Sequence, residues 1–257
     1  MAKISAIVIT YNEAANITEC LESLKWCDEI IVIDSASSDN TCELAREFTN
    51  NITITGNLPY GEKRNIGIEK ASFEWILWID ADERISPELK EEISALINGH
   101  NGLNPKHEAY LVNRRSFFIN KFIKHSGWYP DFTLRLFKRS AGIRFDSLLV
   151  HEKAVYNGST GRLKHDILHY TDRDFEHYIN KLNNYTSLSA EELKAKGKKA
   201  SFFDIIFRPA FAFFKMYFLK LGILDGYTGL VLCSLSSVHV MTKYSKLYLM
   251  NKSKLNN

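Results

Sequence analysis

Apolar runs alternate with helix-type patterns through the first hundred residues, and this alternation limits the possible fold more than any other feature. Ile4–Ile9, Glu29–Ile33 and Trp75–Ile79 are short, apolar-rich runs typical of strands buried on both faces. Between these runs, apolar residues recur at helical spacing. Strands that alternate with helices form right-handed βαβ units, which place the strands in a parallel sheet. The sequence therefore predicts an α/β fold.

Length and charge exclude several classes of protein. The 257 residues allow one large domain, or one domain with an appendage. The 33 basic and 30 acidic residues leave a net charge of +3, whereas nucleic-acid binding usually needs a strong basic stripe. The four cysteines lack metal-ligand spacing, and the first apolar run is too short for a signal peptide. We therefore expect reduced thiols in a cytoplasm and no nucleic-acid partner.

The pattern changes in the second half of the chain. Short strand-like runs at Ala109–Val112, Thr133–Phe137 and Ile167–Tyr170 are separated by turns, which predicts an antiparallel or mixed extension of the sheet. A helix is expected from Arg173 to about Lys196, because apolar residues recur on one face and a glycine follows.

Residues 202–250 are aromatic and apolar, with Lys and Arg at intervals. The longest uncharged stretch, Gly226–Thr242, is shorter than the roughly 20 apolar residues of a spanning helix. Apolar helix faces bordered by basic residues fit the membrane interface. The alternative is that these helices cap the core or form a dimer face.

The motif most informative about chemistry is Asp80-Ala81-Asp82, directly after a buried strand. In an extended segment, residues i and i+2 point to the same side, so both carboxylates could face one pocket. Open α/β sheets bind ligands at the carboxyl ends of their parallel strands. Two oxygen donors there suit Mg²⁺ or Mn²⁺ bridging a diphosphate. The alternative is a solvated turn that matches the motif by chance.

Other polar groups are expected at the same edge of the sheet. Tyr11-Asn12-Glu13 follows the first strand, and Asp34 ends the second. Lys63-Arg64-Asn65 supplies positive charge that could meet phosphates, although an ordinary exposed helix face is the alternative. The sequence has neither GxGxxG after the first strand nor a GxxxxGK[ST] loop. A metal with side chains is therefore expected to hold the phosphates, rather than a glycine-rich loop.

Four segments of the first hundred residues, in this order, carry a family resemblance: VITYNEAANI, VIDSASSDNT, EKRNIG and WILWIDADE. Together they resemble the family 2 glycosyltransferases, which have the GT-A fold. In the second half, GWYPDFTLRLFKR, FDSLLVHEK, ILHY and YINKLNNYT are similar to lipopolysaccharide core glucosyltransferases that add a sugar to heptose. The resemblance implies an inverting, metal-dependent transfer of a sugar, with glucose from a UDP donor expected, onto a glycolipid or lipopolysaccharide core acceptor.

The resemblance also implies an organisation of the chain. Residues 1–172 would form a GT-A catalytic domain, a Rossmann-like mixed sheet flanked by helices. Its nucleotide-sugar-binding half would be residues 1–105, and its acceptor half residues 106–172. Residues 173–257 would form a helical extension that contacts the membrane through residues 202–250. The enzyme would then be cytoplasmic, peripheral on the inner face of the cell membrane.

Individual residues receive roles from the same resemblance. Those that would bind the nucleotide sugar are Thr10, Tyr11, Glu13, Asp34, Lys63, Asn65 and Asp80. Asp82 would bind Mn²⁺ or Mg²⁺, with His151 as a further ligand. Asp131 is preferred as the catalytic base by chain order, and Glu152 is an acceptor-binding group or the alternative base.

Three other functions are weighed against this one. A related branch of the family glycosylates cysteine in peptides, so a peptide acceptor stays open. A nucleotidyltransferase of the same fold generally has a glycine-rich, basic loop after the first strand, and Tyr11–Ala15 is neither. A non-catalytic, membrane-associated partner protein is disfavoured because both aspartates of the Asp80–Asp82 motif are present. No role is assigned to His165 or His169.

Overall fold

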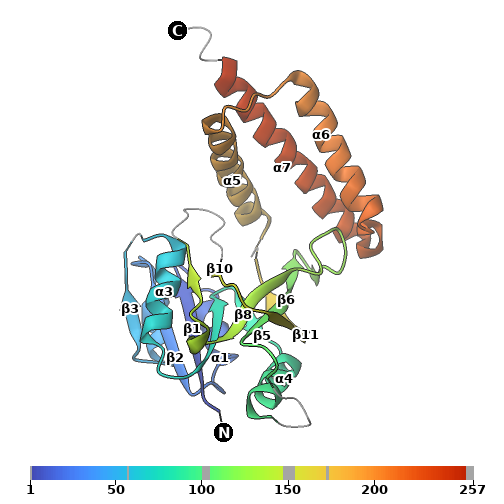
Figure 1. Cartoon of the computed structure of the whole chain (residues 1–257). Helices are drawn as coiled ribbons and strands as arrows, with labels where there is room; N and C mark the ends of the chain where they lie inside the picture. The colour runs from blue at the N-terminus through green and yellow to red at the C-terminus, as the bar shows by residue number, and fades with distance from the viewer. Residues whose placement is uncertain (1, 57, 100–104, 147–153, 172–173, 253–257) are drawn as a thin grey trace. The chain divides into compact units, whose positions relative to one another are not determined.

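The computed structural model describes residues 2–56, 58–99, 105–146, 154–171 and 174–252, and it divides into two compact units (Figure 1). Unit 1 comprises Met1–Arg114 and Asp131–His169. Unit 2 comprises Arg115–Pro130 and Tyr170–Asn257. This division differs from the predicted boundary after residue 172, since residues 115–130 group with the C-terminal helices.

Unit 1 is built on a mixed sheet. Its strands run in the spatial order β3-β2-β1-β4-β8-β6-β11-β5. The last residues of β6, and β7 paired to them, belong to unit 2. The bounds are β1 Ile4–Thr10, β2 Glu29–Asp34, β3 Ile52–Ile54, β4 Trp75–Asp80, β5 Glu83–Ile85, β6 Ala109–Phe118, β7 Lys121–Phe122, β8 Phe132–Lys138 and β11 Thr160–His169. β1 pairs in parallel with β2 and β4, whereas β8 runs antiparallel to β4 and β6. A short ribbon of β9 (Arg144–Phe145) and β10 (Ala154–Val155) lies outside this sheet. The predicted parallel core with an antiparallel extension is confirmed.

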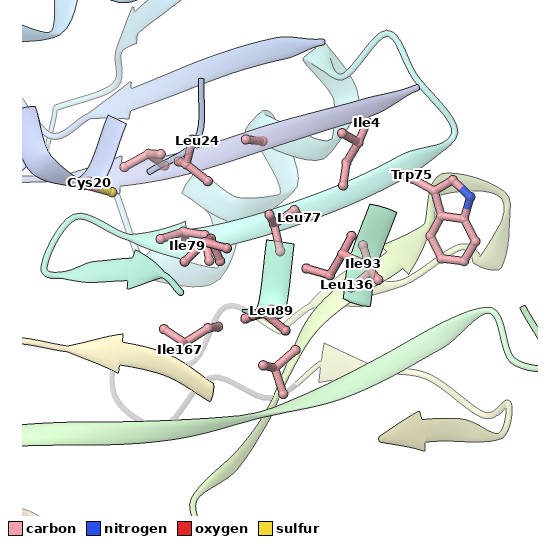
Figure 2. Packing of buried hydrophobic residues seen from close by; sticks show 14 of the residues in the cluster. Ile4, Cys20, Leu24, Trp75, Leu77, Ile79, Leu89, Ile93, Leu136 and Ile167 are labelled. Carbon is pink, nitrogen blue, oxygen red and sulfur yellow. The ribbon is translucent and has the colours of Figure 1, made fainter. Parts of the chain in front are cut away.

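Helices cover both faces of the sheet, which explains why β1 and β4 are buried along their length and mostly apolar. Ala6 and Val8 of β1 belong to one core cluster with α1 (Ile17–Glu22), α2 (Thr41–Arg46) and α4 (Pro87–Asn98). In Figure 2, Leu77 of β4 lies in this cluster with Leu89 and Ile93 of α4. Ile7 and Ile9 belong to a second cluster with α3 (Tyr60–Lys70). A strand buried on both faces has no position for a polar stripe.

Local sequence fixes where two of these helices lie. Ser86 accepts a hydrogen bond from the Leu89 N–H at 3.2 Å and Pro87 takes the first helical position, so α4 begins as the sequence predicts. In α3, a Cβ at Gly67 would lie 2.5 Å from Cγ2 of Ile7. Glycine therefore allows α3 to lie close against β1.

Unit 2 contains three long helices, α5 (Phe175–Ala195), α6 (Phe202–Phe214) and α7 (Gly226–Lys252), with the short turns η3 (Lys215–Leu219) and η4 (Gly222–Asp225) between α6 and α7. α7 packs against both α5 and α6 (Figure 1). The Lys246 ammonium donates hydrogen bonds to the Asn183 carbonyl at 2.8 Å and to Thr186 Oγ1 at 2.9 Å, which ties α7 to α5. The predicted helix near 173–196 is confirmed.

Residues 115–130 belong to unit 2 because buried contacts hold them there. Phe118 packs edge-on against both Trp128 and Tyr178, with ring centroids 5.7 and 5.4 Å apart. The buried carboxylate of Asp225 accepts a hydrogen bond from the His125 N–H at 3.0 Å. The contacts with Tyr178 and Asp225 join residues 60 and 100 positions apart, so no local pattern predicts them.

One helical segment within the described residues, Gly222–Lys252, is long and apolar enough by length and composition to cross a membrane. It exceeds the uncharged stretch Gly226–Thr242, because the helix continues through Lys243 and Lys246. Length therefore does not exclude a spanning helix, although a helix packed inside a protein passes the same test.

Candidate active site

Parallel pairing brings the ends of three strands to one edge of the sheet. Thr10, the last residue of β1, is paired with Asp34, the last residue of β2. On the other side of β1, Ile9 is paired with Asp80, the last residue of β4. The strand-end carboxylates therefore gather where open α/β sheets bind ligands.

Hydrogen bonds join the loops that follow β1 and β2. The Asn12 N–H donates to Ser37 Oγ at 2.8 Å, and the Ser38 N–H donates to Asn12 Oδ1 at 2.8 Å. Ser37 in turn donates to Asp34 from its N–H at 2.8 Å and from its hydroxyl at 2.6 Å. These bonds fix the fully buried Asp34 carboxylate and the shape of this edge.

The remaining groups after β1 differ in their surroundings. The Tyr11 ring is 56% exposed, so one aromatic surface faces solvent at the strand end. Glu13 accepts a hydrogen bond from the Asn16 amide at 2.7 Å. The hydroxyls of Thr10 and Ser35 are buried and make no hydrogen bond within the described part of the chain. Buried hydroxyls are normally paired, so these two need an explanation.

Two basic side chains of helix α3 are buried, so the alternative that Lys63-Arg64-Asn65 forms an ordinary exposed helix face is wrong. Lys63 and Arg64 are both buried. Burial lowers the pKa of Lys63, and the negative charge of Asp34 opposes this effect. The ammonium lies 4.9 Å from the ring centroid of Tyr60. The amide of Asn65 exchanges two hydrogen bonds of 2.9 Å with the backbone of Phe145, which explains this side chain without a ligand.

Asp80 and Glu83 share one buried arginine. The Arg135 guanidinium, 1% exposed, donates to Asp80 at 2.8 Å and to Glu83 at 2.5 Å. It also lies 3.6 Å from the ring centroid of Trp78. Burial alone would raise the pKa of Asp80, but the charges of Arg135 and Arg64 hold it at about 2. Burial raises the pKa of Glu83 despite Arg135, because this carboxylate has no access to solvent.

Asp82 lies apart from this network. The sequence argument assumed an extended Asp80–Asp82 segment, but β4 ends at Asp80 and the chain turns at Ala81 and Asp82. The Asp82 carboxylate lies 3.2 Å from Nε2 of His169, the last residue of β11. His151, the predicted ligand, lies outside the described residues. Within the described part of the chain, no group of three His, Cys, Asp or Glu side chains is placed to hold a metal.

Asp131 is held from two sides. Nε and Nη2 of Arg114 donate to its Oδ2 at 2.9 and 2.6 Å, and the Asp131 N–H donates to Asn113 Oδ1 at 2.7 Å. The Asp131 side chain is still 39% exposed. Arg114 also lies 3.7 Å from Glu83. Burial disfavours the charged guanidinium, but Glu83 and Asp131 outweigh this and raise the pKa of Arg114. Glu152, the alternative base, lies outside the described residues.

Sequence reasoning missed Glu83, Arg114 and His169. Each contacts a partner 17 or more positions away in the sequence, so spacing alone does not reveal it. One local signal was available for Glu83, because it directly follows the Asp80–Asp82 motif. For His169, the signal was its place at the end of a predicted strand.

The arrangement combines three chemical abilities. Tyr11 and the buried hydroxyls offer a surface for a nucleoside at the ends of β1 and β2. Asp82 and His169 offer one oxygen and one nitrogen donor to a cation. Asp131 offers an oriented, accessible carboxylate that can accept a proton.

The chain is similar to several known proteins. A family model described as glycosyl transferase family 2 matches residues 5–149. The lipopolysaccharide core biosynthesis glycosyltransferase LpsC of Rhizobium meliloti is 29% identical, over 95% of this chain and 92% of the relative. An uncharacterized glycosyltransferase of Rickettsia felis is 30% identical, over 90% of this chain and 84% of the relative. The crystal structure of Staphylococcus aureus TarS 1-349 in complex with UDP aligns with a TM-score of 0.49 and 16% identity, over 98% of this chain and 92% of that chain.

Proposed function

The chain belongs to glycosyl transferase family 2 and is a glycosyltransferase with the GT-A fold, and from this premise we propose an inverting, metal-dependent transfer of glucose from a UDP donor onto a lipopolysaccharide core or related glycolipid acceptor. One observation carries the proposal. A continuous ion-pair network runs from Asp80 at the end of β4, through Arg135, Glu83 and Arg114, to Asp131. This network connects Asp80, at the proposed donor site, to Asp131, the proposed base. The likeness to LpsC over nearly the whole chain supports the acceptor class.

The donor would bind at the ends of β1, β2 and β4. Tyr11 offers its exposed ring for stacking on the uracil, and the unpaired hydroxyl of Thr10 offers a hydrogen bond. Asp34 would contact the base or ribose, and Asp80 the ribose. Lys63 would attract the diphosphate, since burial strengthens the attraction of an ammonium for an anion. Glu13 remains a candidate for the nucleoside pocket.

A divalent cation fits the donor set at Asp82. The carboxylate of Asp82 and the imidazole of His169 are the two protein groups that would hold it, and an oxygen with a neutral nitrogen suits Mn²⁺. When bound, the ion would neutralise charge on the departing diphosphate. His169 would then take the ligand role that the family resemblance implied for His151.

Asp131 would act as the base. Arg114 holds one carboxylate oxygen, Oδ2, by two hydrogen bonds, which orients the other oxygen toward an acceptor hydroxyl. Removal of the hydroxyl proton makes the acceptor oxygen a better nucleophile, and such a base contributes roughly 10²–10⁴ in rate. A single displacement at the anomeric carbon inverts its configuration, so an α-linked donor gives a β-glycoside.

Residues 202–250 would hold the enzyme on the inner face of the cell membrane, in the cytoplasm. The α6 helix exposes Phe203, Phe207 and Phe211 beside the exposed Arg208. Large exposed apolar patches bordered by cations mark interaction surfaces, and anionic membranes attract such surfaces. A peripheral position would bring a water-soluble nucleotide donor and a lipid-anchored acceptor to the same enzyme.

Calorimetric binding of UDP, with and without Mn²⁺, tests the donor site. We expect Mn²⁺-dependent binding to the wild type, its loss on addition of EDTA, and its loss in Asp82→Ala. Glu91→Ala removes an exposed carboxylate from α4 and serves as the matched control. UDP binding that is unchanged in Asp82→Ala, in a variant that melts like the wild type, would overturn the metal assignment.

Asp131→Asn tests the base. The amide keeps the shape of the side chain but does not accept the proton, so transfer to heptose-containing lipopolysaccharide should fall by roughly 10²–10⁴. UDP binding should be unchanged, because Asp131 is not assigned to the donor. A variant that transfers glucose at the wild-type rate would remove Asp131 from this role and leave Glu152 as the candidate.

A further inference from the structure

Unit 2 contains a cavity of about 550 Å³ that the proposed transfer chemistry does not use. Trp128 and Tyr178 form one wall, Ala212 of α6 and Val240 of α7 form others, and η3 contributes Met216. A second cavity of about 200 Å³ shares Trp128 and Tyr178 with the first. Small-molecule sites typically have volumes of about 300–1,000 Å³ and mainly apolar walls.

The aromatic wall is held rigidly. Trp128 and Tyr178 both pack edge-on against the buried ring of Phe118. The loop before Trp128 is fixed by Asp225, which accepts hydrogen bonds from the His125 N–H at 3.0 Å and the Ser126 hydroxyl at 3.3 Å. The cavity is therefore largely formed before any ligand binds, which lowers the entropic cost of binding.

The charged side chains that line the cavity are positive. Lys215 and Lys220 line it together with His239. Burial lowers the pKa of His239, and the positive charges of Lys243 and Lys246 lower it further. Among the described residues that line the two cavities there is no Asp, Glu, Asn or Gln. A sugar would need such side chains for its hydroxyl groups, whereas an anion with an apolar tail needs cations and apolar walls.

The cavity also opens beside the surface proposed to lie on the membrane. Lys215 and Met216 belong to η3, and the same turn exposes Phe218 and Leu219. Phe214, directly before η3, is exposed as well. A lipid at the membrane surface would therefore meet cations and apolar side chains on one short segment.

We propose that this cavity binds one anionic membrane lipid, with its phosphate at Lys215 and Lys220 and its acyl chain against Trp128, Met216 and Val240. The inference rests on the proposed membrane association of residues 202–250. It adds a specific lipid site to what would otherwise be non-specific adsorption of an apolar surface.

Calorimetry with short-chain lipids tests this site without vesicles. The probes are dihexanoyl phosphatidic acid below its micelle concentration, dihexanoyl phosphatidylcholine, and inorganic phosphate. We expect phosphatidic acid to bind and the other two to bind at least about tenfold more weakly, because each lacks either the net charge or the chain. Inorganic phosphate binding as tightly as phosphatidic acid would overturn the proposal, since the apolar walls would then contribute nothing.

Two double variants distinguish binding of the lipid in the cavity from general electrostatic attraction to the protein. Lys215→Ala with Lys220→Ala should weaken phosphatidic acid binding by about tenfold or more. Lys198→Ala with Lys199→Ala removes the same charge from exposed positions outside the cavity and should leave the affinity within about twofold. Equal losses in the two double variants would show that only net charge matters and would overturn the proposal.

Filling the cavity tests the apolar part. Ala212→Trp, or Ser236→Trp from α7 should the first variant not fold, keeps both lysines and should abolish binding. Unchanged binding in a folded variant would overturn the proposal. UDP binding measured on the same samples separates the two hypotheses: loss of lipid binding alone concerns the lipid site, whereas absence of UDP binding in the wild type concerns the donor assignment.

Discussion

Replacing Arg135 by methionine should destabilise unit 1 by about 3–5 kcal/mol, because the change leaves the fully buried carboxylate of Glu83 without its nearest cation. Arg135 is 1% exposed and pairs with Glu83 at 2.5 Å and with Asp80 at 2.8 Å. Methionine has a similar length, so the packing against Trp78 is largely kept while the charge is removed. At about 2–4 °C per kcal/mol for a domain of this size, the melting temperature should fall by about 6–20 °C.

The pH dependence of this loss follows from Glu83. Burial already raises the pKa of Glu83 above its unfolded value, and removal of the guanidinium raises it further. A carboxyl group with a raised folded-state pKa stabilises the protein below its unfolded pKa, and this stability is lost as the pH rises through the folded-state pKa. The destabilisation by Arg135→Met should therefore be larger at neutral pH than at acidic pH.

Urea unfolding followed by tryptophan fluorescence measures this effect in unit 1 alone. Of the four tryptophans, only Trp128 lies in unit 2, so a Trp128→Phe background restricts the signal to unit 1. Arg144→Met is the matched control, since Arg144 is 52% exposed and lies 3.8 Å from Glu69. Such surface pairs contribute about 0–1 kcal/mol. If Arg135→Met cost no more than Arg144→Met, the reasoning about buried charge would be refuted.

Three further predictions concern packing and helix ends. Gly67→Ala should cost about 1–3 kcal/mol by chemical denaturation, because the new Cβ would lie 2.5 Å from Ile7; a neutral result would mean that α3 shifts freely. Ser86→Ala should cost about 0.5–2 kcal/mol, since the Leu89 N–H loses its cap, whereas Ser86→Asp should retain the cap and most of the stability. Lys246→Met should increase amide hydrogen exchange in α5 and α7, because the ammonium joins these helices; unchanged exchange would assign that joining to apolar packing.

The parts of unit 1 that the sequence predicts are those determined by local patterns. β1 and β4 are recognisable because strands buried on both faces form nearly continuous apolar runs. The start of α4 is recognisable because Ser86 and Pro87 are a cap and a first-turn residue. Parallel pairing then implies that the strand-end side chains meet, as Thr10 and Asp34 do.

The parts that escape prediction depend on contacts between distant residues. Glu83 and Arg135 are 52 positions apart, and their pairing follows from where β5 and β8 lie relative to the Asp80 end of β4. His169 is 87 positions from Asp82, and it reaches that carboxylate because β11 pairs antiparallel with β5. Neither the spacing of residues nor the periodicity of apolar positions predicts which strands pair, or in which register.

The electrostatics of the network separate the two aspartates that the motif presents as a pair. Arg64 lies 3.9 Å from Asp80 and extends the network to three guanidinium groups and three carboxylates, those of Arg64, Arg114, Arg135, Asp80, Glu83 and Asp131. Its formal charges cancel, so it offers no excess positive charge to a diphosphate. Asp80 is therefore already neutralised by arginines, whereas Asp82 pairs with the imidazole of His169 and with no guanidinium in the described part of the chain. The charge of an incoming diphosphate would have to be balanced by Lys63 and by a cation held at Asp82 and His169, which is why we assign Asp80 to the ribose and Asp82 to the metal.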